Sequence, residues 1–264
     1  MSVRSVRRRR DAGFSLIELA IGLVIVATLL SSLLVPLVTQ LDQKRTAETQ
    51  RLLEQAREAL IGFAAANNRL PCPATAASNG NESFAAGGSA TTGACVLTPG
   101  TTGFLPGATL GLSPLDAQGF YVDAFASDRN RIRYAVSDQT IGGSTNPFTR
   151  INGMKPNPTM MNAIAASGSL LFVCSATPTA AANCGTATPL ANGTAIAVIF
   201  SPGKNATLNT PSADELENTD GDDVFVSRTY SDRSTGTSSV FDDQMLWLSP
   251  APLFSRLLSA GALP

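Results

Sequence analysis

The chain has 264 residues, of which 44% are hydrophobic and 6% aromatic, and its 19 Lys and Arg residues nearly balance 20 Asp and Glu residues, for a net charge of −1. This balance argues against nucleic-acid binding, which needs clustered Lys and Arg to displace phosphate counterions. The sequence has no His, the commonest general base and transition-metal ligand, and no Gly-x-Ser-x-Gly or phosphate-loop motif, so we expect no enzymatic activity.

The amino-terminal segment combines a basic leader with a long apolar run. Five arginines lie within residues 4–10, and Gly13 and Phe14 follow shortly after them. Residues 19–38 form an apolar run that is broken only by small or hydroxyl-bearing residues and by Pro36, and such a run is long enough to cross a bilayer. One acid, Glu18, stands at its start, where an ionised side chain in hydrocarbon costs about 2.5–3.5 kcal/mol and usually has a partner.

The helix is predicted to continue beyond the apolar run. Leu52, Ala56 and Leu60 recur at helical spacing and form one apolar face, while charged side chains occupy the remaining positions. Asn67 and the prolines that follow it predict the end of the helix. We therefore expect one helix over residues 14–66, with its first part in lipid and its second part packed on a globular domain.

The rest of the chain, residues 67–264, is rich in Gly, Ala, Ser and Thr, which predicts a loop-rich domain. Apolar or alternating patterns predict five strands, at residues 131–136, 170–174, 195–200, 224–228 and 240–248. The last two strands are expected to pair as a hairpin, and a short terminal helix is predicted at residues 250–260. Together these elements predict an α+β fold, in which the long helix packs on a small antiparallel sheet.

Four cysteines lie in the predicted globular domain, at Cys72, Cys95, Cys174 and Cys184. The basic leader is expected to stay in the cytoplasm, which places this domain on the opposite side of the membrane. An even number of cysteines in an exported domain indicates disulfides. Three connectivities are possible, and proximity in sequence favours pairing the first two and the last two. The spacings and the missing His argue against a zinc site.

A basic leader, a Gly-Phe pair, an acid four residues after the Phe and an unbroken apolar helix resemble the class III signal of type IV pilins and type II secretion pseudopilins. The resemblance implies that a prepilin peptidase cuts between Gly13 and Phe14, releasing residues 1–13, and methylates the amino terminus of Phe14. It further implies that Glu18 pairs with the amino-terminal ammonium of a neighbouring subunit during assembly.

This resemblance implies a structural subunit, a pseudopilin or minor pilin, of an envelope-spanning filament. Its partners would be the prepilin peptidase, other pilin or pseudopilin subunits, the inner-membrane assembly platform and the lipid bilayer. Before assembly, residues 14–38 would cross the inner membrane once and residues 67–264 would be periplasmic; afterwards the subunit would lie in a filament or at the cell surface. The alternative is a membrane-anchored periplasmic binding or adhesive domain that does not polymerise.

The carboxyl-terminal half resembles the major pseudopilins of type II secretion systems. The similarity lies in residues 116–119, the Arg133-Tyr134 strand, residues 201–205, and Asp243 with Trp247 four residues on. In that family a carboxyl-terminal loop binds calcium, so the resemblance implies a calcium site here. The corresponding region is much longer in this chain. The long disulfide-bearing domain favours an atypical type IV pilin instead, and both alternatives stay open.

The candidate calcium ligands are three acids of one turn, Asp220, Asp222 and Asp223, with Asp243 from the last strand. Calcium takes six to eight oxygen ligands from carboxylates, carbonyls and water. Asp242 is not expected to join Asp243, because neighbouring residues of a strand point to opposite faces of the sheet. An ordinary solvated acidic turn is the alternative interpretation.

Overall fold

The computed structural model describes residues 15–97, 102–125, 130–155, 162, 164, 168–179, 182–207, 211–231 and 240–263, apart from the side chains of residues 30–38. Gly13 and Phe14, which form the predicted cleavage site, lie outside the described residues, as does the leader before them. The chain divides into two compact units, Met1–Thr46 and Ala47–Pro264.

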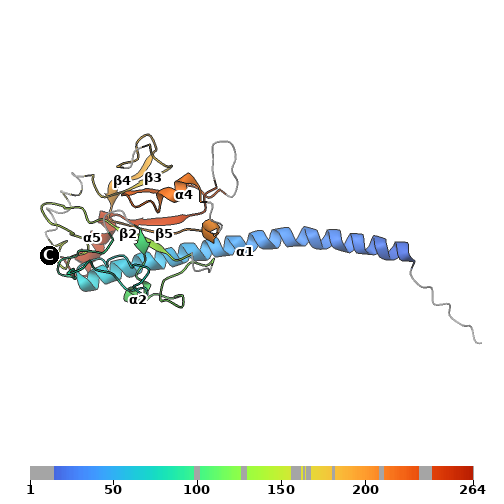
Figure 1. Cartoon of the computed structure of the whole chain (residues 1–264), viewed down its shortest axis with the longest axis horizontal. Helices are drawn as coiled ribbons and strands as arrows, with labels where there is room; N and C mark the ends of the chain where they lie inside the picture. Colours follow the sequence, from blue (N-terminus) through green and yellow to red (C-terminus); the bar gives the residue numbers. More distant parts are fainter. Residues whose placement is uncertain are drawn as a thin grey trace, which may run out of the picture. The chain divides into compact units, whose positions relative to one another are not determined.

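Helix α1 covers Leu16–Asn67 and contributes to both units (Figure 1). Its bounds agree with the helix predicted over residues 14–66. The part in the second unit is rich in Ala, Leu, Glu and Arg, which favour helix, and it contains no Pro. The helix ends where Asn68 adopts a positive φ of 55°, a left-handed conformation that is common just beyond a helix and that Asn tolerates.

The second unit contains a four-stranded antiparallel sheet in the order β1-β2-β5-β7. Its strands are β1 (Gly103–Phe104), β2 (Arg133–Val136), β5 (Ala197–Ser201) and β7 (Gln244–Leu248). All five residues of β5 are buried, in agreement with the strong apolar run predicted as a strand there. β7 pairs with β5, so the predicted hairpin between residues 224–228 and 240–248 is wrong.

A second, three-stranded sheet has the order β4-β3-β6. Its strands are β4 (Pro189–Ala195), β3 (Leu171–Cys174) and β6 (Val224–Val226). β3 pairs antiparallel with β4 but parallel with β6, so the prediction of one antiparallel sheet is corrected at this point. The three residues of β6 are all buried, and burial of this kind is typical of strands in a parallel pairing.

The other helices with described bounds are short. They are α2 (Gly107–Leu110), the 3-10 helix η1 (Asn205–Thr207), α4 (Ala213–Glu217) and α5 (Pro250–Ser259). α5 confirms the predicted terminal helix and buries Leu253, Phe254 and Leu257 on one face. The predicted α+β class is thus confirmed, with the strands divided between two sheets.

The hydrophobic core of the second unit has two large layers and a small third cluster around the Cys174–Cys184 disulfide. One layer, which includes Leu52, Leu60 and Leu253, joins α1 and α5 to the four-stranded sheet. The other layer joins the two sheets and includes Phe200 and Phe225, whose ring centroids are 6.4 Å apart. In Figure 1 the cyan part of α1 accordingly runs along β2 and β5, with β3 and β4 beyond them.

Disulfides and one ion pair fix the loops around this core. Cys72 is bonded to Cys95 and Cys174 to Cys184, which is the pairing favoured by sequence proximity. Glu82 lies between the first two cysteines and accepts hydrogen bonds from Arg69, at 2.6 and 2.7 Å, and from the backbone N–H of Cys72. Because the Arg69 and Glu82 side chains are only 7% and 16% exposed, this bidentate pair ties the loop to the end of α1.

Candidate functional site

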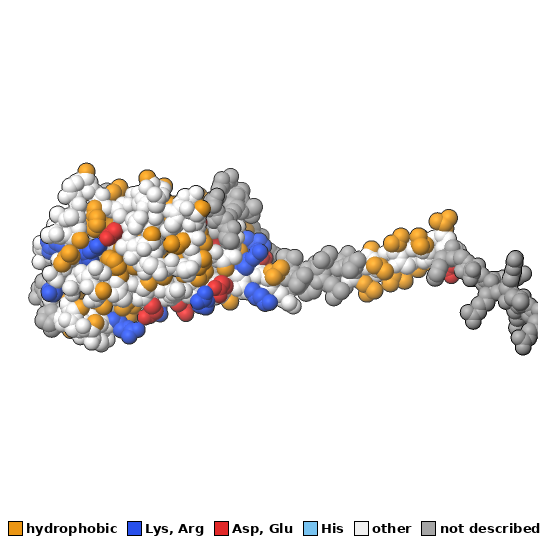
Figure 2. Space-filling model, turned by 90° about the horizontal axis from the view of Figure 1, so that it is seen from below, with side chains coloured by type: hydrophobic (Ala, Val, Ile, Leu, Met, Phe, Trp, Pro, Cys, Tyr) orange, Lys and Arg blue, Asp and Glu red, His pale blue; other side chains and the backbone are white. Residues whose placement is uncertain are grey.

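The first unit presents an apolar helix surface. Nine large apolar side chains between residues 16 and 29 are each more than half exposed. Figure 2 shows these hydrophobic side chains along the described amino-terminal stretch of α1. Contiguous apolar surface of this extent marks a protein–protein or membrane contact.

Glu18 lies at the edge of this apolar surface and also caps the helix. Its Oε2 accepts hydrogen bonds from the backbone N–H and the hydroxyl of Ser15, both at 3.0 Å, and its own N–H donates to Ser15 Oγ at 3.3 Å. This reciprocal arrangement is a capping box, a role that the Ser15-x-x-Glu18 spacing signals and that our sequence analysis missed. No described residue donates a hydrogen bond to Glu18 Oε1, so one carboxylate oxygen is available for another group.

A shallow groove of about 410 Å³ adjoins Glu18 and is lined by Leu19, Gly22, Leu23 and Val26. A Cβ atom at Gly22 would meet nothing within 4 Å, so the absence of a side chain there opens the groove. Small residues of this kind let another helix approach closely. The carboxylate and the groove therefore form a surface that a second helix with a cationic end would complement.

Within the part of the chain that the structure describes, no helix is both long and apolar enough to cross a membrane. The predicted transmembrane segment, residues 14–38, reaches beyond that part, since residue 14 and the side chains of residues 30–38 lie outside the described residues.

The second unit contains a buried group of three carboxylates. Oxygens of Glu215, Asp242 and Asp243 all lie within 4.8 Å of one another, and the three residues are no more than 8% exposed. The prediction that Asp242 and Asp243 would not share a site is wrong. Both residues precede β7, which begins at Gln244, so the alternation of a strand does not separate their side chains.

Surrounding donors satisfy part of this buried group. Glu215 Oε1 accepts from Asn205 Nδ2 at 2.8 Å and from the backbone N–H of Asp242 at 3.0 Å. Asp243 Oδ2 accepts from Asn218 Nδ2 at 2.8 Å. Asp242 Oδ1, in contrast, is buried without a hydrogen-bond partner among the described residues. Such an oxygen is costly to bury, which favours a bound cation or a proton.

Burial raises the pKa of both aspartates. Loss of hydration is the largest cause, and it raises the pKa of Asp242 to about 6. The same cause raises the pKa of Asp243 well above its usual value, with further increases from the neighbouring charges of Glu215 and Asp242. Gly203, which has a φ of 68°, lies so close that a Cβ atom there would collide with the Asp242 carboxylate. This glycine therefore makes room for the group.

A second acidic group lies nearer the surface. Oxygens of Glu217, Asp220 and Asp222 lie within 4.8 Å of one another, and Asp220 is exposed. Desolvation, followed by repulsion from Asp220 and Asp222, raises the pKa of Glu217 to about 7. No described Lys or Arg forms an ion pair with these three carboxylates.

The four predicted calcium ligands are therefore not brought together. Asp220 and Asp222 belong to the surface group and Asp243 to the buried one. Asp223 joins neither group, and its Oδ2 accepts a hydrogen bond from Gln139 at 3.2 Å. Only Asp243 of the buried group was a predicted ligand. Glu215 and Asp242 were not predicted, although the Ser212-x-x-Glu215 capping box that positions Glu215 was visible in the sequence.

Residues 8–34 match the family model for the prokaryotic N-terminal methylation motif. The matched segment contains Gly13, Phe14 and Glu18, and the match supports a type IV pilin- or pseudopilin-like protein. This class III signal implies processing by a prepilin peptidase, a membrane-anchored amino terminus and assembly with other pilin-type subunits. In two further comparisons, no curated protein sequence and no solved structure matches the chain.

Proposed function

We propose that this protein is a structural subunit, a pseudopilin or minor pilin, of an envelope filament of the type II secretion or type IV pilus kind. The observation that carries the proposal is the methylation motif at residues 8–34, together with the apolar face that α1 exposes with Glu18 at its edge. Before assembly, residues 14–38 lie in the inner membrane and the second unit lies in the periplasm. The subunit has no enzymatic role.

Assembly follows from the chemistry of the helix end. Cleavage after Gly13 creates a cationic, methylated amine on Phe14. Glu18 keeps its capping bonds to Ser15 through Oε2 and uses Oε1 to accept a hydrogen bond from this amine on a neighbouring subunit. An unpaired carboxylate in hydrocarbon costs about 2.5–3.5 kcal/mol, so pairing removes a penalty that each isolated subunit carries. The exposed apolar faces then pack on each other in place of lipid.

Two measurements test the filament role. Intact-mass analysis of the protein from cells with an active prepilin peptidase should show loss of residues 1–13 and the gain of one methyl group. Glu18→Ala should leave processing intact but abolish the assembled, sedimentable form. If Glu18→Ala assembles as well as the parent chain, or if the leader stays attached, the proposed role is wrong. Ligand binding that survives without assembly would support the non-polymerising alternative.

We also propose that the buried group of Glu215, Asp242 and Asp243 binds calcium and so stabilises the second unit. The unpartnered Asp242 Oδ1, the close Gly203 backbone and an all-oxygen donor set fit a hard cation. Calcium that binds only the folded chain would add about 2.7 kcal/mol of stability at 100 times its dissociation constant.

A chelator titration tests the calcium proposal. Removing calcium should lower the melting temperature of the parent chain, and Asp243→Asn should abolish that response. Asp220→Asn, in the surface acidic group, is the control that should keep it. If the melting temperature is the same with calcium and with chelator, the calcium proposal is wrong. Loss of the response in Asp220→Asn alone would instead assign the metal to the surface group.

A further inference from the structure

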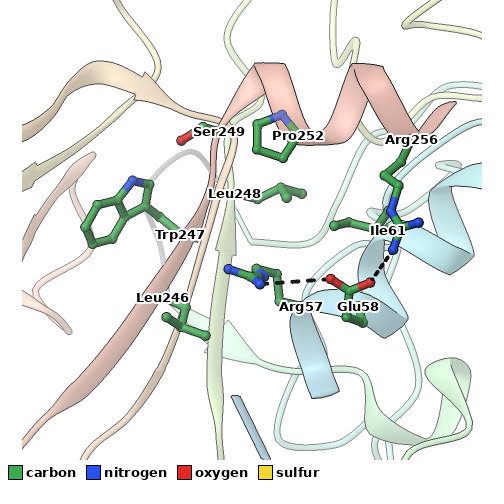
Figure 3. Close-up of a pocket in the computed structure, with 9 residues that line it drawn as sticks. All are labelled: Arg57, Glu58, Ile61, Leu246, Trp247, Leu248, Ser249, Pro252 and Arg256. Atoms are coloured by element: carbon green, nitrogen blue, oxygen red, sulfur yellow. Dashed lines mark hydrogen bonds and ion pairs between the residues drawn. The ribbon is translucent and has the colours of Figure 1, made fainter. Parts of the chain in front are cut away.

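The second unit carries a groove of about 400 Å³ between α1, β7 and α5 (Figure 3). Ile61, Leu248 and Pro252 contribute its apolar lining. Its rim is charged: Glu58 lies between two arginines, 3.0 Å from Arg256 and 3.9 Å from Arg57. One acid therefore balances only one of two cations, and the groove keeps an excess positive charge.

The strand that borders this groove has an open edge. β7 is the last strand of its sheet, and among the described residues it pairs only with β5. A terminal strand presents unpaired backbone N–H and C=O groups, which another chain can bind. The groove therefore combines apolar surface, an excess cation and free backbone groups.

The same unit carries a complementary surface at the acidic turn before β6. Glu217 at the end of α4 contributes to it with Asp220 and Asp222 of the turn, and none of the ion pairs between described residues includes these three carboxylates. The turn belongs to the layer of the three-stranded sheet, whereas the groove belongs to the layer of α1 and the four-stranded sheet. One copy of the chain thus presents a basic-rimmed groove and an uncompensated acidic turn as two different patches.

We propose that the groove formed by α1, β7 and α5 in one copy receives the acidic turn of the next copy. A contact between two different patches repeats head to tail, and it produces an open helical filament whenever the rotation does not close a ring. This inference rests on the proposed filament role and names the contact between the globular units. The apolar lining supplies the contact area, while the charges fix orientation and exclude wrong partners.

Cross-linking in the full-length protein tests this contact. All four native cysteines are paired in disulfides, so thiols introduced at Asp220 and Arg256 would be the reactive ones. A chain carrying Asp220→Cys and Arg256→Cys, expressed with the assembly machinery and treated with a short bis-maleimide, should give a ladder of multimers. A mixture of the two single variants should stop at dimers, and either variant alone should give none.

The outcomes separate this inference from the filament role. If the double-cysteine chain forms filaments that depend on Glu18 but gives no ladder, the groove proposal fails and the filament role stands. A ladder that persists in Glu18→Ala would mean that the contact is not a filament contact, and this also overturns the proposal. Cross-linked products that join Arg256→Cys to a different envelope protein would show that the groove binds another partner, and this result would contradict the proposal.

Charge reversal provides a second test with a matched control. Arg256→Glu should weaken assembly by about fivefold, because exposed ion pairs are each worth little, and adding Asp220→Arg should restore it. Arg51→Glu is the control, since Arg51 is equally exposed (61% against 62%) and likewise pairs with a Glu. Equal loss in Arg51→Glu, or no rescue in the double variant, contradicts the proposal.

Discussion

The two units of this chain differ in whether their apolar side chains are exposed or buried within the unit. In the described part of the first unit, nine large apolar side chains of α1 are more than half exposed, and no described residue donates a hydrogen bond to Glu18 Oε1. The second unit buries its apolar side chains in two layers of its own and is closed by two disulfides. The first unit therefore needs another molecule to satisfy its surface, whereas the second satisfies most of its groups internally.

This contrast indicates which features of each unit are candidates for a functional role. In the first unit the unusual feature is exposed apolar surface, which points outward to a neighbour or to lipid. In the second unit the unusual features are clustered acids, namely the buried carboxylates, of which Asp243 interacts with the charge of Arg133, and the acidic turn. Variants that affect one unit and leave the other unchanged are the most direct test of this difference between the units.

The largest effect is expected from Glu18→Gln. Gln can replace Glu in a capping box, so α1 should keep its first turn, but the negative charge is lost. We expect assembly to disappear while the melting temperature of the second unit stays unchanged. Sedimentation of the filament form and thermal unfolding of the same preparation measure the two quantities.

Ser15→Ala is the matched control for Glu18→Gln. It removes the capping partner at a cost of about 1 kcal/mol and leaves the carboxylate in place, so assembly should persist. The opposite pattern, in which Glu18→Gln assembles and Ser15→Ala does not, would mean that Glu18 acts only as a helix cap.

The next largest effect concerns the second unit alone. Removing the Cys72–Cys95 disulfide with a double Ser substitution should lower the free energy of unfolding by about 3 kcal/mol, because the bond closes a long loop. The Cys174–Cys184 bond closes a shorter loop, of 10 rather than 23 residues, and should contribute somewhat less. Chemical denaturation measures both values. Leader processing should be unaffected, and a processing defect would show that the units depend on each other.

The same contrast explains what the sequence could predict. α1, the disulfides and five of the seven described strands depend on local periodicity or short separations, and each was predicted close to its observed place. β1 and β4 carry no clear apolar pattern and were not predicted. Strand partners depend on residues far apart in the chain, so the parallel pairing of β3 with β6 was missed. The carboxylate group was missed for a similar reason: Glu215 lies 27 residues before Asp242, and only the fold brings them together.

The smallest expected effect is the pH dependence of the second unit without calcium. Burial raises the folded pKa of Asp242 to about 6 and that of Asp243 well above its usual value, whereas an unfolded Asp has a pKa of about 3.9. The folded chain therefore binds more protons than the unfolded chain between these values, and stability falls as the pH rises through this window. In a chelator, the melting temperature should be a few degrees higher at about pH 5 than at about pH 7.5.

Calcium should reverse the sign of this dependence, because the cation binds the ionised carboxylates and competes with protons. Asp243→Asn cannot ionise at this position, so its melting temperature in chelator should vary less with pH than that of the parent chain. Glu54→Gln, which removes an exposed carboxylate on α1, should leave the dependence unchanged. A parent chain that becomes steadily more stable from about pH 5 to about pH 7.5 without calcium would show that the buried carboxylates are compensated by another group.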